Sequence, residues 1–159
     1  MICSKALLTG KDNGHHLSAI MTENSMYGLQ PMARPADPAG PWKLLSRPPH
    51  FHDGSLLFDD DGRVYLFHST GQLTELKPDL TDVLPGGINQ QIFERDADEQ
   101  GLLEGSSVIK HNGKYYLLMI SMDWSIPGRL RREVCYRADK ITGPYEKRVI
   151  LETEFDGHG

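Results

Sequence analysis

The sequence predicts an all-β protein built from four-stranded antiparallel sheets. Three observations favour this fold class: short β-rich runs, frequent turn residues, and a hairpin that is built twice. The 159 residues include 16 glycines and 10 prolines, and no long apolar stripe with helical period stands out. The dipeptides Asp61-Gly62 and Asn112-Gly113 each separate two β-rich runs, as tight hairpin turns do.

Seven strands are expected in chain order. They cover residues 55–58, 63–68, 72–76, 107–110, 114–121, 133–137 and 145–151. The runs 64–67 and 115–119 are apolar at nearly every position, without the alternation of a sheet that faces water on one side. Strands of this kind are expected in sheets that are covered on both faces.

The spacing of the turns predicts a β-propeller. Gly62 and Gly113 are 51 positions apart (113 − 62), and Gly40 and Gly143 are 103 apart (143 − 40), about twice as far. A four-stranded unit that recurs every ~40–50 residues is typical of a propeller blade. We expect one domain, residues 1–159, in which residues 36–159 form blades and residues 1–35 belong to an earlier blade. Two to three blades do not close a ring, so a piece of a larger propeller is expected.

Two carboxylates occupy matched places in the repeated unit. Asp53 lies in His52-Asp53-Gly54-Ser55, and Glu104 lies in Leu103-Glu104-Gly105-Ser106. In both copies an acid and a glycine precede a short apolar strand, a polar turn and an aromatic-rich strand. Paired carboxylates at equivalent places are a candidate acid–base site. Taken alone, Asp53 could instead cap a turn.

Composition excludes several other classes of protein. The net charge of −5 argues against a nucleic-acid partner, and no apolar run approaches the roughly 20 residues that span a membrane. Cys3 and Cys135 are too few for a disulfide framework or a zinc site. The acidic run 59–61 lacks the spacing and closing glutamate of a calcium loop, and turn chemistry explains it better. No metal and no cofactor are expected, and the compartment stays open.

Several motifs in the expected order resemble glycoside hydrolase family 43. The matching elements are Ala36-Asp37-Pro38-Ala39-Gly40-Pro41-Trp42, the segment 52–66, Leu103-Glu104-Gly105-Ser106, Lys114-Tyr115-Tyr116-Leu117 and the segment 136–145. They extend over about two thirds of the chain. This family contains five-bladed propellers, among them β-xylosidases, α-L-arabinofuranosidases and arabinanases. The resemblance implies a partial five-bladed β-propeller of about two to three blades.

The resemblance also implies roles for the two acids. Glu104 matches the general acid, and Asp53 matches the carboxylate that raises the pKa of that acid and orients it. The family's general base lies in an Asp-Pro motif of the first blade. Asp37-Pro38 is the only Asp-Pro pair here, and no apolar strand follows it. We therefore expect that the chain starts after the base, stops before the later blades, and is nearly inactive alone.

Three further residues are candidate substrate contacts. Trp124 follows the Glu104 blade's central strand and could stack on a sugar ring, although core packing fits equally well. His52 is expected to line the central funnel beside Asp53. Arg129 belongs to a small basic run whose default role is that of a solvated loop. The expected partner is a carbohydrate of arabinoxylan or xylo-oligosaccharide type.

The predicted function is inverting hydrolysis of terminal arabinofuranosyl or xylosyl bonds in plant-wall polysaccharides. One alternative is a non-catalytic propeller that binds carbohydrate or protein, which the missing base favours. The invertase and fructosyltransferase group is more remote, because its acid stands beside a cysteine and Glu104 is followed by Gly105. Open blade edges also predict self-association.

Overall fold

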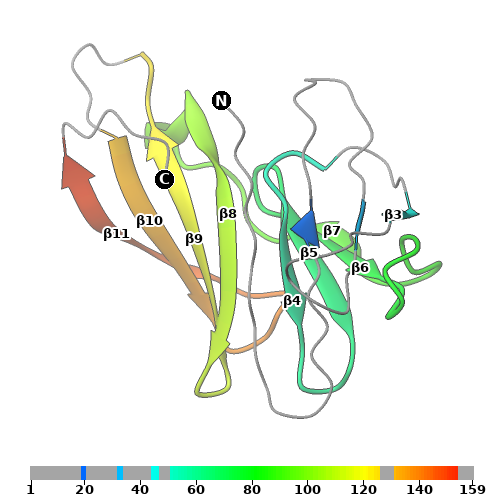
Figure 1. Cartoon of the computed structure of the whole chain (residues 1–159). Helices are drawn as coiled ribbons and strands as arrows, with labels where there is room; N and C mark the ends of the chain where they lie inside the picture. The colour runs from blue at the N-terminus through cyan, green and yellow to red at the C-terminus, as the bar shows by residue number, and fades with distance from the viewer. Residues whose placement is uncertain (1–18, 21–31, 34–43, 47–50, 126–130, 154–159) are drawn as a thin grey trace.

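Two four-stranded antiparallel sheets dominate the structure, a computed structural model that describes residues 19–20, 32–33, 44–46, 51–125 and 131–153 (Figure 1). The first sheet has the order β4 (Ser55–Phe58), β5 (Val64–His68), β6 (Gln72–Leu76), β7 (Asn89–Gln91). The second comprises β8 (Leu102–His111), β9 (Lys114–Met122), β10 (Arg131–Ala138) and β11 (Glu146–Thr153). Each is a simple meander, as expected of a propeller blade.

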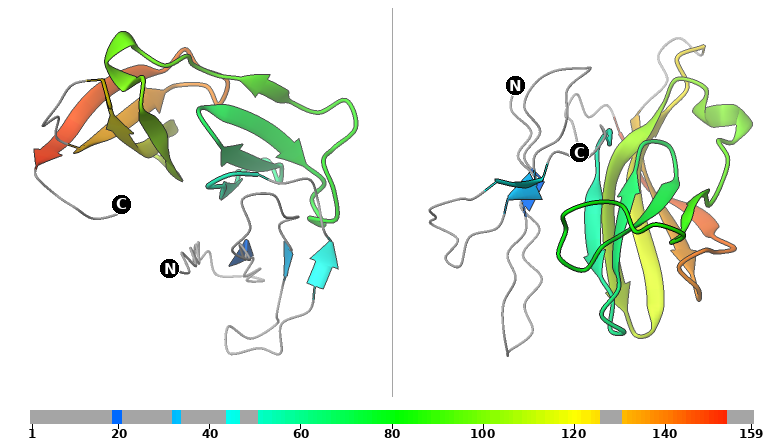
Figure 2. Two further views of the ribbon diagram at one scale, coloured as in Figure 1. Left: turned by 90° about the horizontal axis from the view of Figure 1, so that it is seen from above. Right: turned by 90° about the vertical axis from the view of Figure 1, so that its right-hand side faces the viewer.

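A third, smaller sheet precedes these two blades. It has the order β1 (Ala19–Ile20), β2 (Met32–Ala33), β3 (Leu44–Ser46). Seen from above, the three sheets follow one another in an arc (Figure 2). The described part of the chain therefore forms two complete blades and part of an earlier one, which confirms the predicted partial propeller.

The seven predicted strands are all present, and most of their bounds agree to within two residues. β8 begins at Leu102, five residues before the expected 107, so that Glu104 lies inside the strand. The short strands β1 to β3, the strand β7 and the 3₁₀ helix η1 (Ala97–Glu99) were not predicted as elements. β7 reads Asn-Gln-Gln and lies at a partly exposed sheet edge, so it carries no apolar pattern that could have marked it.

The innermost strands of the two blades, β4 and β8, lie side by side and run in the same direction. The amide of Val108 donates to the Ser55 hydroxyl oxygen at 3.1 Å. Further along both strands, Lys110 and the Tyr115 hydroxyl bind the carboxylate of Asp59, the latter at 2.6 Å. Equivalent positions of the two repeats are thereby placed next to each other.

The main hydrophobic core fills the space between the two blades. Its buried members come from both sheets: Leu57, Tyr65, Phe67, Leu73, Leu103, Val108, Tyr115, Leu117, Met119, Val134 and Tyr136. A second cluster covers the other face of the first sheet and includes Phe51, Leu56 and Leu66. The first blade is therefore apolar on both faces, as its strands predicted. In β9 burial alternates instead, and Leu118 and Ile120 are only half-buried among the described residues.

The segment between the blades packs against the second one through stacked rings. Phe93 lies parallel to Tyr136 with ring centroids 3.9 Å apart, and Tyr145 meets Phe93 edge-on. Tyr145 also donates to the Ile141 carbonyl at 2.8 Å. Within the described ranges no helix has the length and apolarity needed to cross a membrane.

We predict that Asp59→Asn lowers the free energy of unfolding by about 2 kcal/mol at pH 7, because a hydrogen-bonded charge is lost at the junction of the blades. Burial raises the pKa of the Asp59 carboxyl, but bonds from Lys110 and Tyr115 outweigh it and hold the pKa below the ordinary 3.8. A lowered pKa in the folded state means that the stabilisation is complete above pH ~4 and is lost as the pH falls through the folded value.

Urea unfolding of wild type and Asp59→Asn at several pH values measures this effect. The difference between them should be largest at pH 7 and should shrink below pH ~4. Asp61→Asn is the control, because Asp61 is exposed and pairs only with Arg63 within its own turn. It should cost under about 1 kcal/mol. Equal effects of the two substitutions would show that the junction is not held in this way.

Candidate active site

Two residues with positive φ lie where the carboxylates meet, at the same end of β4 and β8. Asp53 has φ 49° in the turn just before β4. Gly105 has φ 77° at a bulge in β8, where the pairing with β9 shifts between Glu104 and Ser107. Glycine adopts this left-handed conformation without a steric penalty, and bulges often redirect side chains next to functional sites. In the Glu104 copy of the repeated motif, the glycine after the acid therefore provides the left-handed backbone conformation of the bulge.

The side chains of Asp53 and Glu104 meet across the two blades, with His52 between them. The His52 Nε2 atom lies 3.1 Å from Glu104 Oε2 and 3.6 Å from Asp53 Oδ2. The backbone amide of Gly105 donates to Asp53 Oδ2 at 3.2 Å. The side chains of Asp53 and Glu104 are 37% and 35% exposed, so solvent reaches both carboxylates. The predicted meeting of the two acids is present in the structure.

This cluster of His52, Asp53 and Glu104 can exchange protons with a bound molecule. Its donor atoms lie within 4.8 Å of one another, a spacing that would also suit a cation. The contact of the imidazole with Glu104 satisfies that carboxylate without an ion. A second acidic group, Asp96, Asp98 and Glu99, is neutralised by Lys147 and Arg132 and has a structural role.

Comparison with known proteins identifies the relationship. The family model described as "Glycosyl hydrolases family 43" matches residues 20–154, which is most of the chain. The chain belongs to glycoside hydrolase family 43. A protein of Xylanibacter ruminicola that is provisionally named a beta-xylosidase is 29% identical over 133 residues, or 76% of this chain and 23% of the relative.

Solved family-43 structures share the fold. A bifunctional GH43-CE protein of Bacteroides eggerthii superimposes with a TM-score of 0.72 at 34% identity, over 96% of this chain and 20% of that one. The GH43 protein BlXynB of Bacillus licheniformis gives 0.64 at 25% identity, over 86% and 28%. This chain thus spans about a fifth to three tenths of the length of these relatives.

Trp124 is a rigid exposed aromatic on the same rim of this family-43 blade. It follows the end of β9, whose residue Ile120 pairs with Glu104, and it is 69% exposed. The turn that carries it is fixed by the buried Asp123, which accepts hydrogen bonds from the Ser125 amide and hydroxyl. A Cβ atom on Gly101 would lie 2.4 Å from the Trp124 ring, so the indole packs directly on that glycine. The alternative prediction, that Trp124 packs in the core, is therefore wrong. Arg129, the third candidate contact, lies outside the described residues.

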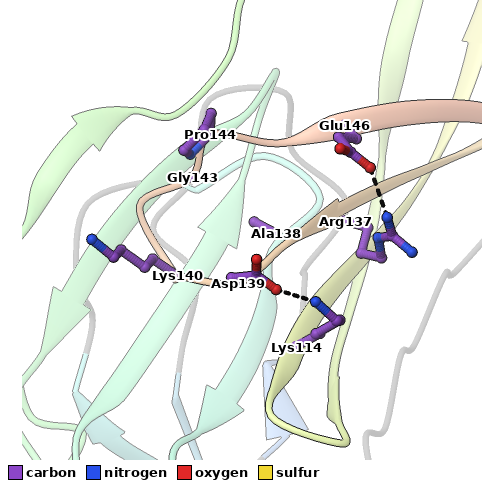
Figure 3. Close-up of a pocket in the computed structure, with 8 residues that line it drawn as sticks. All are labelled: Lys114, Arg137, Ala138, Asp139, Lys140, Gly143, Pro144 and Glu146. Atoms are coloured by element: carbon purple, nitrogen blue, oxygen red, sulfur yellow. Dashed lines mark hydrogen bonds and ion pairs between the residues drawn. The ribbon is translucent and has the colours of Figure 1, made fainter.

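Several hollows lie away from this cluster, and two of them adjoin the blade that carries Glu104. The larger of these two, about 790 Å³, is lined by the far ends of β4 and β8, including Asp59, Lys110 and Asn112. The other, about 310 Å³, lies where β10 turns into β11 (Figure 3). Lys114 pairs with Asp139 there and Arg137 with Glu146, while Lys140 lies beside them. Neither hollow contains Asp53 or Glu104, so the His52 cluster is the candidate site.

Some contacts that build the site could not be predicted from the sequence. They are the bond from the Gly105 amide to Asp53, the packing of Trp124 on Gly101, and the contacts of the turn Ser69–Gly71. All three depend on backbone geometry, which residue types alone do not reveal. His68 ends β5 half-buried against Phe51 and bonded to Thr74. Burial lowers the pKa of His68 to about 4, which keeps this ring neutral beside the site.

We predict that Gly101→Ala displaces the Trp124 indole, because the added methyl group would overlap the ring. Tryptophan fluorescence in a Trp42→Phe background isolates the signal of Trp124. The emission maximum and acrylamide quenching should both change. Gln100→Ala, one position earlier and exposed, is the control and should leave both unchanged. An unaltered spectrum in Gly101→Ala would mean that Trp124 does not rest on this glycine.

Proposed function

We propose that this family-43 chain contributes the general acid and its orienting carboxylate to an inverting glycoside hydrolase. The substrate would be terminal arabinofuranosyl or xylosyl units of plant-wall polysaccharide. The observation that carries the proposal is the meeting of Glu104 and Asp53 from equivalent places on adjacent blades, with His52 between them. Relatives named as beta-xylosidase and described as GH43 enzymes support the substrate class.

Glu104 is the proposed general acid, which protonates the departing glycosidic oxygen. Its carboxyl is accessible, and its strand is held by the bulge at Gly105. Asp53 is the proposed orienting carboxylate that also favours the protonated acid, because like charges disfavour joint ionisation. Its contact with the Gly105 amide ties it to the backbone next to Glu104.

Asp53 is not well placed to be the general base. Inverting enzymes separate acid and base by ~6.5–9.5 Å so that a water fits between base and sugar. Donor atoms of Asp53 and Glu104 lie within 4.8 Å of each other, which leaves no room for that water. The base therefore has to come from elsewhere in a complete ring. We propose that the chain alone is nearly inactive, since acid–base assistance is typically worth ~10²–10⁴-fold.

Trp124 and His52 are the proposed substrate contacts. An exposed indole on a rigid turn offers its apolar face to the C–H groups of a sugar ring. His52 is half-exposed and lies between the two acids, where it would adjoin a sugar bound to them. Arg129 stays a candidate contact on the sequence alone.

A non-catalytic carbohydrate-binding propeller is the second candidate function. It would use the same exposed groups, Trp124 and His52, without proton transfer from Glu104. A complete ring that binds xylo-oligosaccharides but never cleaves them would establish this alternative.

We predict that Glu104→Gln lowers kcat on 4-nitrophenyl pentosides by about 10²–10⁴-fold when the blades stand in a complete ring, because the proton donor is removed. KM should change little. Glu94→Gln, an exposed residue of the segment between the blades, is the matched control and should retain full activity. Full activity in Glu104→Gln would refute the assignment.

The anomeric form of the product tests the role of Asp53 separately. Proton NMR of the first product formed should show inversion. Retention would instead make Asp53 a nucleophile, because retaining pairs stand only ~5–5.5 Å apart.

The edge strand β11 supports the proposed self-association. Among the described strands it pairs with β10 alone, and Val149, Ile150 and Leu151 are 46%, 55% and 55% exposed. Arg148 and Glu152 stand two positions on either side of Ile150. Antiparallel pairing of two copies about Ile150 would therefore set each arginine opposite a glutamate, a favourable cross-strand pair.

We predict that sedimentation velocity of the isolated chain shows concentration-dependent dimers, and that Ile150→Lys makes it monomeric because an edge lysine blocks strand pairing. Ile109→Lys, an exposed apolar position on the inner strand β8, is the control and should leave the dimer intact. A wild-type chain that is monomeric at all concentrations would exclude the edge as an interface.

A further inference from the structure

We propose that Thr70 is a positioning residue that sets the backbone of Glu104 relative to Asp53. Thr70 lies in the three-residue turn between β5 and β6, Ser69–Gly71, where His68 and Gln72 form the last pair of the ladder. This turn touches both segments that carry the site, through two consecutive residues. The catalytic meaning of the proposal rests on the proposed function, but the contacts themselves do not.

Ser69 holds the segment that carries Asp53. Its backbone amide donates to the carbonyl of His52 at 2.6 Å, one residue before the carboxylate. The preceding residue, His68, packs its ring on Phe51 with centroids 4.7 Å apart. Residues 51–53 are thus attached to the end of β5 rather than left as a free loop.

Thr70 holds the segment that carries Glu104. Its hydroxyl donates to the carbonyl of Leu103 at 3.1 Å, across from one blade to the next. That carbonyl belongs to the peptide bond that joins Leu103 to Glu104. A hydrogen bond at this oxygen therefore fixes the peptide plane from which the acid's side chain departs.

The orientation of Thr70 is itself determined by other side chains. Arg95 donates from Nη2 to the Thr70 hydroxyl oxygen at 3.0 Å, which leaves the hydroxyl proton for Leu103. Gln91 donates from Nε2 to the Thr70 carbonyl at 2.6 Å. Arg95 also binds the carbonyl of the buried Glu99 at 3.2 Å. The threonine is therefore held at its carbonyl by Gln91 of β7 and at its hydroxyl by Arg95 of the segment between the blades.

The turn cannot move independently, because Gly71 packs against an aromatic ring. A Cβ atom at Gly71 would lie 2.6 Å from Phe93, and the Gly71 carbonyl accepts the Ile92 amide at 2.9 Å. Phe93 is stacked on Tyr136 in the second blade. The turn of the first blade is therefore seated on the second blade, and Thr70 transmits the relative position of the two.

Amide hydrogen exchange at Gly105 tests the proposal without any need for glycosidase activity. This amide donates to Asp53, so its protection reports whether Asp53 and the Glu104 segment are in place. Thr70→Val keeps the shape and removes the hydroxyl. We expect Gly105 to exchange about 3- to 10-fold faster in the otherwise folded chain, the effect of one lost hydrogen bond.

Three controls make the result specific. Thr70→Ser keeps the hydroxyl and should restore wild-type exchange. Thr81→Val removes a hydroxyl that binds only Asp79 in an exposed turn, and should change nothing at Gly105. The amides of Leu66 and Leu117, central in each sheet, should keep their protection in every variant.

Two results would overturn the proposal. Unchanged exchange at Gly105 in Thr70→Val would show that the hydroxyl does not set this segment. Faster exchange at Gly105, Leu66 and Leu117 together would show that Thr70 only contributes to global stability. If Thr70→Val does not fold, Arg95→Met removes the bond that orients the hydroxyl, and the same comparison decides. Absence of hydrolysis by the complete ring would leave this result unaffected and would reject only the proposed function.

Discussion

The lateral contact of the inner strands β4 and β8 is the constraint on which the rest of the structure depends. Propeller blades share no backbone hydrogen-bond ladder with their neighbours, so their relative placement relies on side chains. Here Ser55 binds the Val108 amide, and Asp59 binds Lys110 and Tyr115. The contact of Asp59 with Lys110 joins equivalent positions of the repeated unit, and each acid of the candidate site stands near the start of the same pair of strands.

Polar contacts at this junction determine register, while apolar burial supplies most of the stabilisation. The core cluster between the blades includes fully buried Tyr65, Phe67 and Leu117. Burial of side chains of this size contributes roughly 1.5–3 kcal/mol each, more than a single exchanged hydrogen bond. Such a core tolerates sliding, because apolar contact has little directionality. The directional bonds therefore decide which residues of the two blades face each other.

The fold could be predicted largely from the sequence because its signals are local. Short β-rich runs and the turns at Gly62 and Gly113 specify hairpins, and their spacing specifies the blade. The carboxylates could be predicted because the unit is repeated. Two contacts could not be predicted: that of Asp53 with the Gly105 amide, and that of the Thr70 hydroxyl with the Leu103 carbonyl. They join residues that are 52 and 33 positions apart in the sequence. Nor could β7 be predicted, because its polar side chains follow no periodicity.

The bulge in β8 has a consequence for the variation that the strand can accept. Leu103 and Val108 are both buried, although an odd number of positions separates them, and an uninterrupted strand would direct them to opposite faces. The extra residue at Gly105 restores the phase. Removal of one residue from 104–106 would make the spacing of Leu103 and Val108 even, so an uninterrupted strand would keep both side chains on the core face. The bulge itself would be lost, and with it the backbone conformation next to Glu104. The packing of the blade could therefore survive a deletion that misdirects the acid.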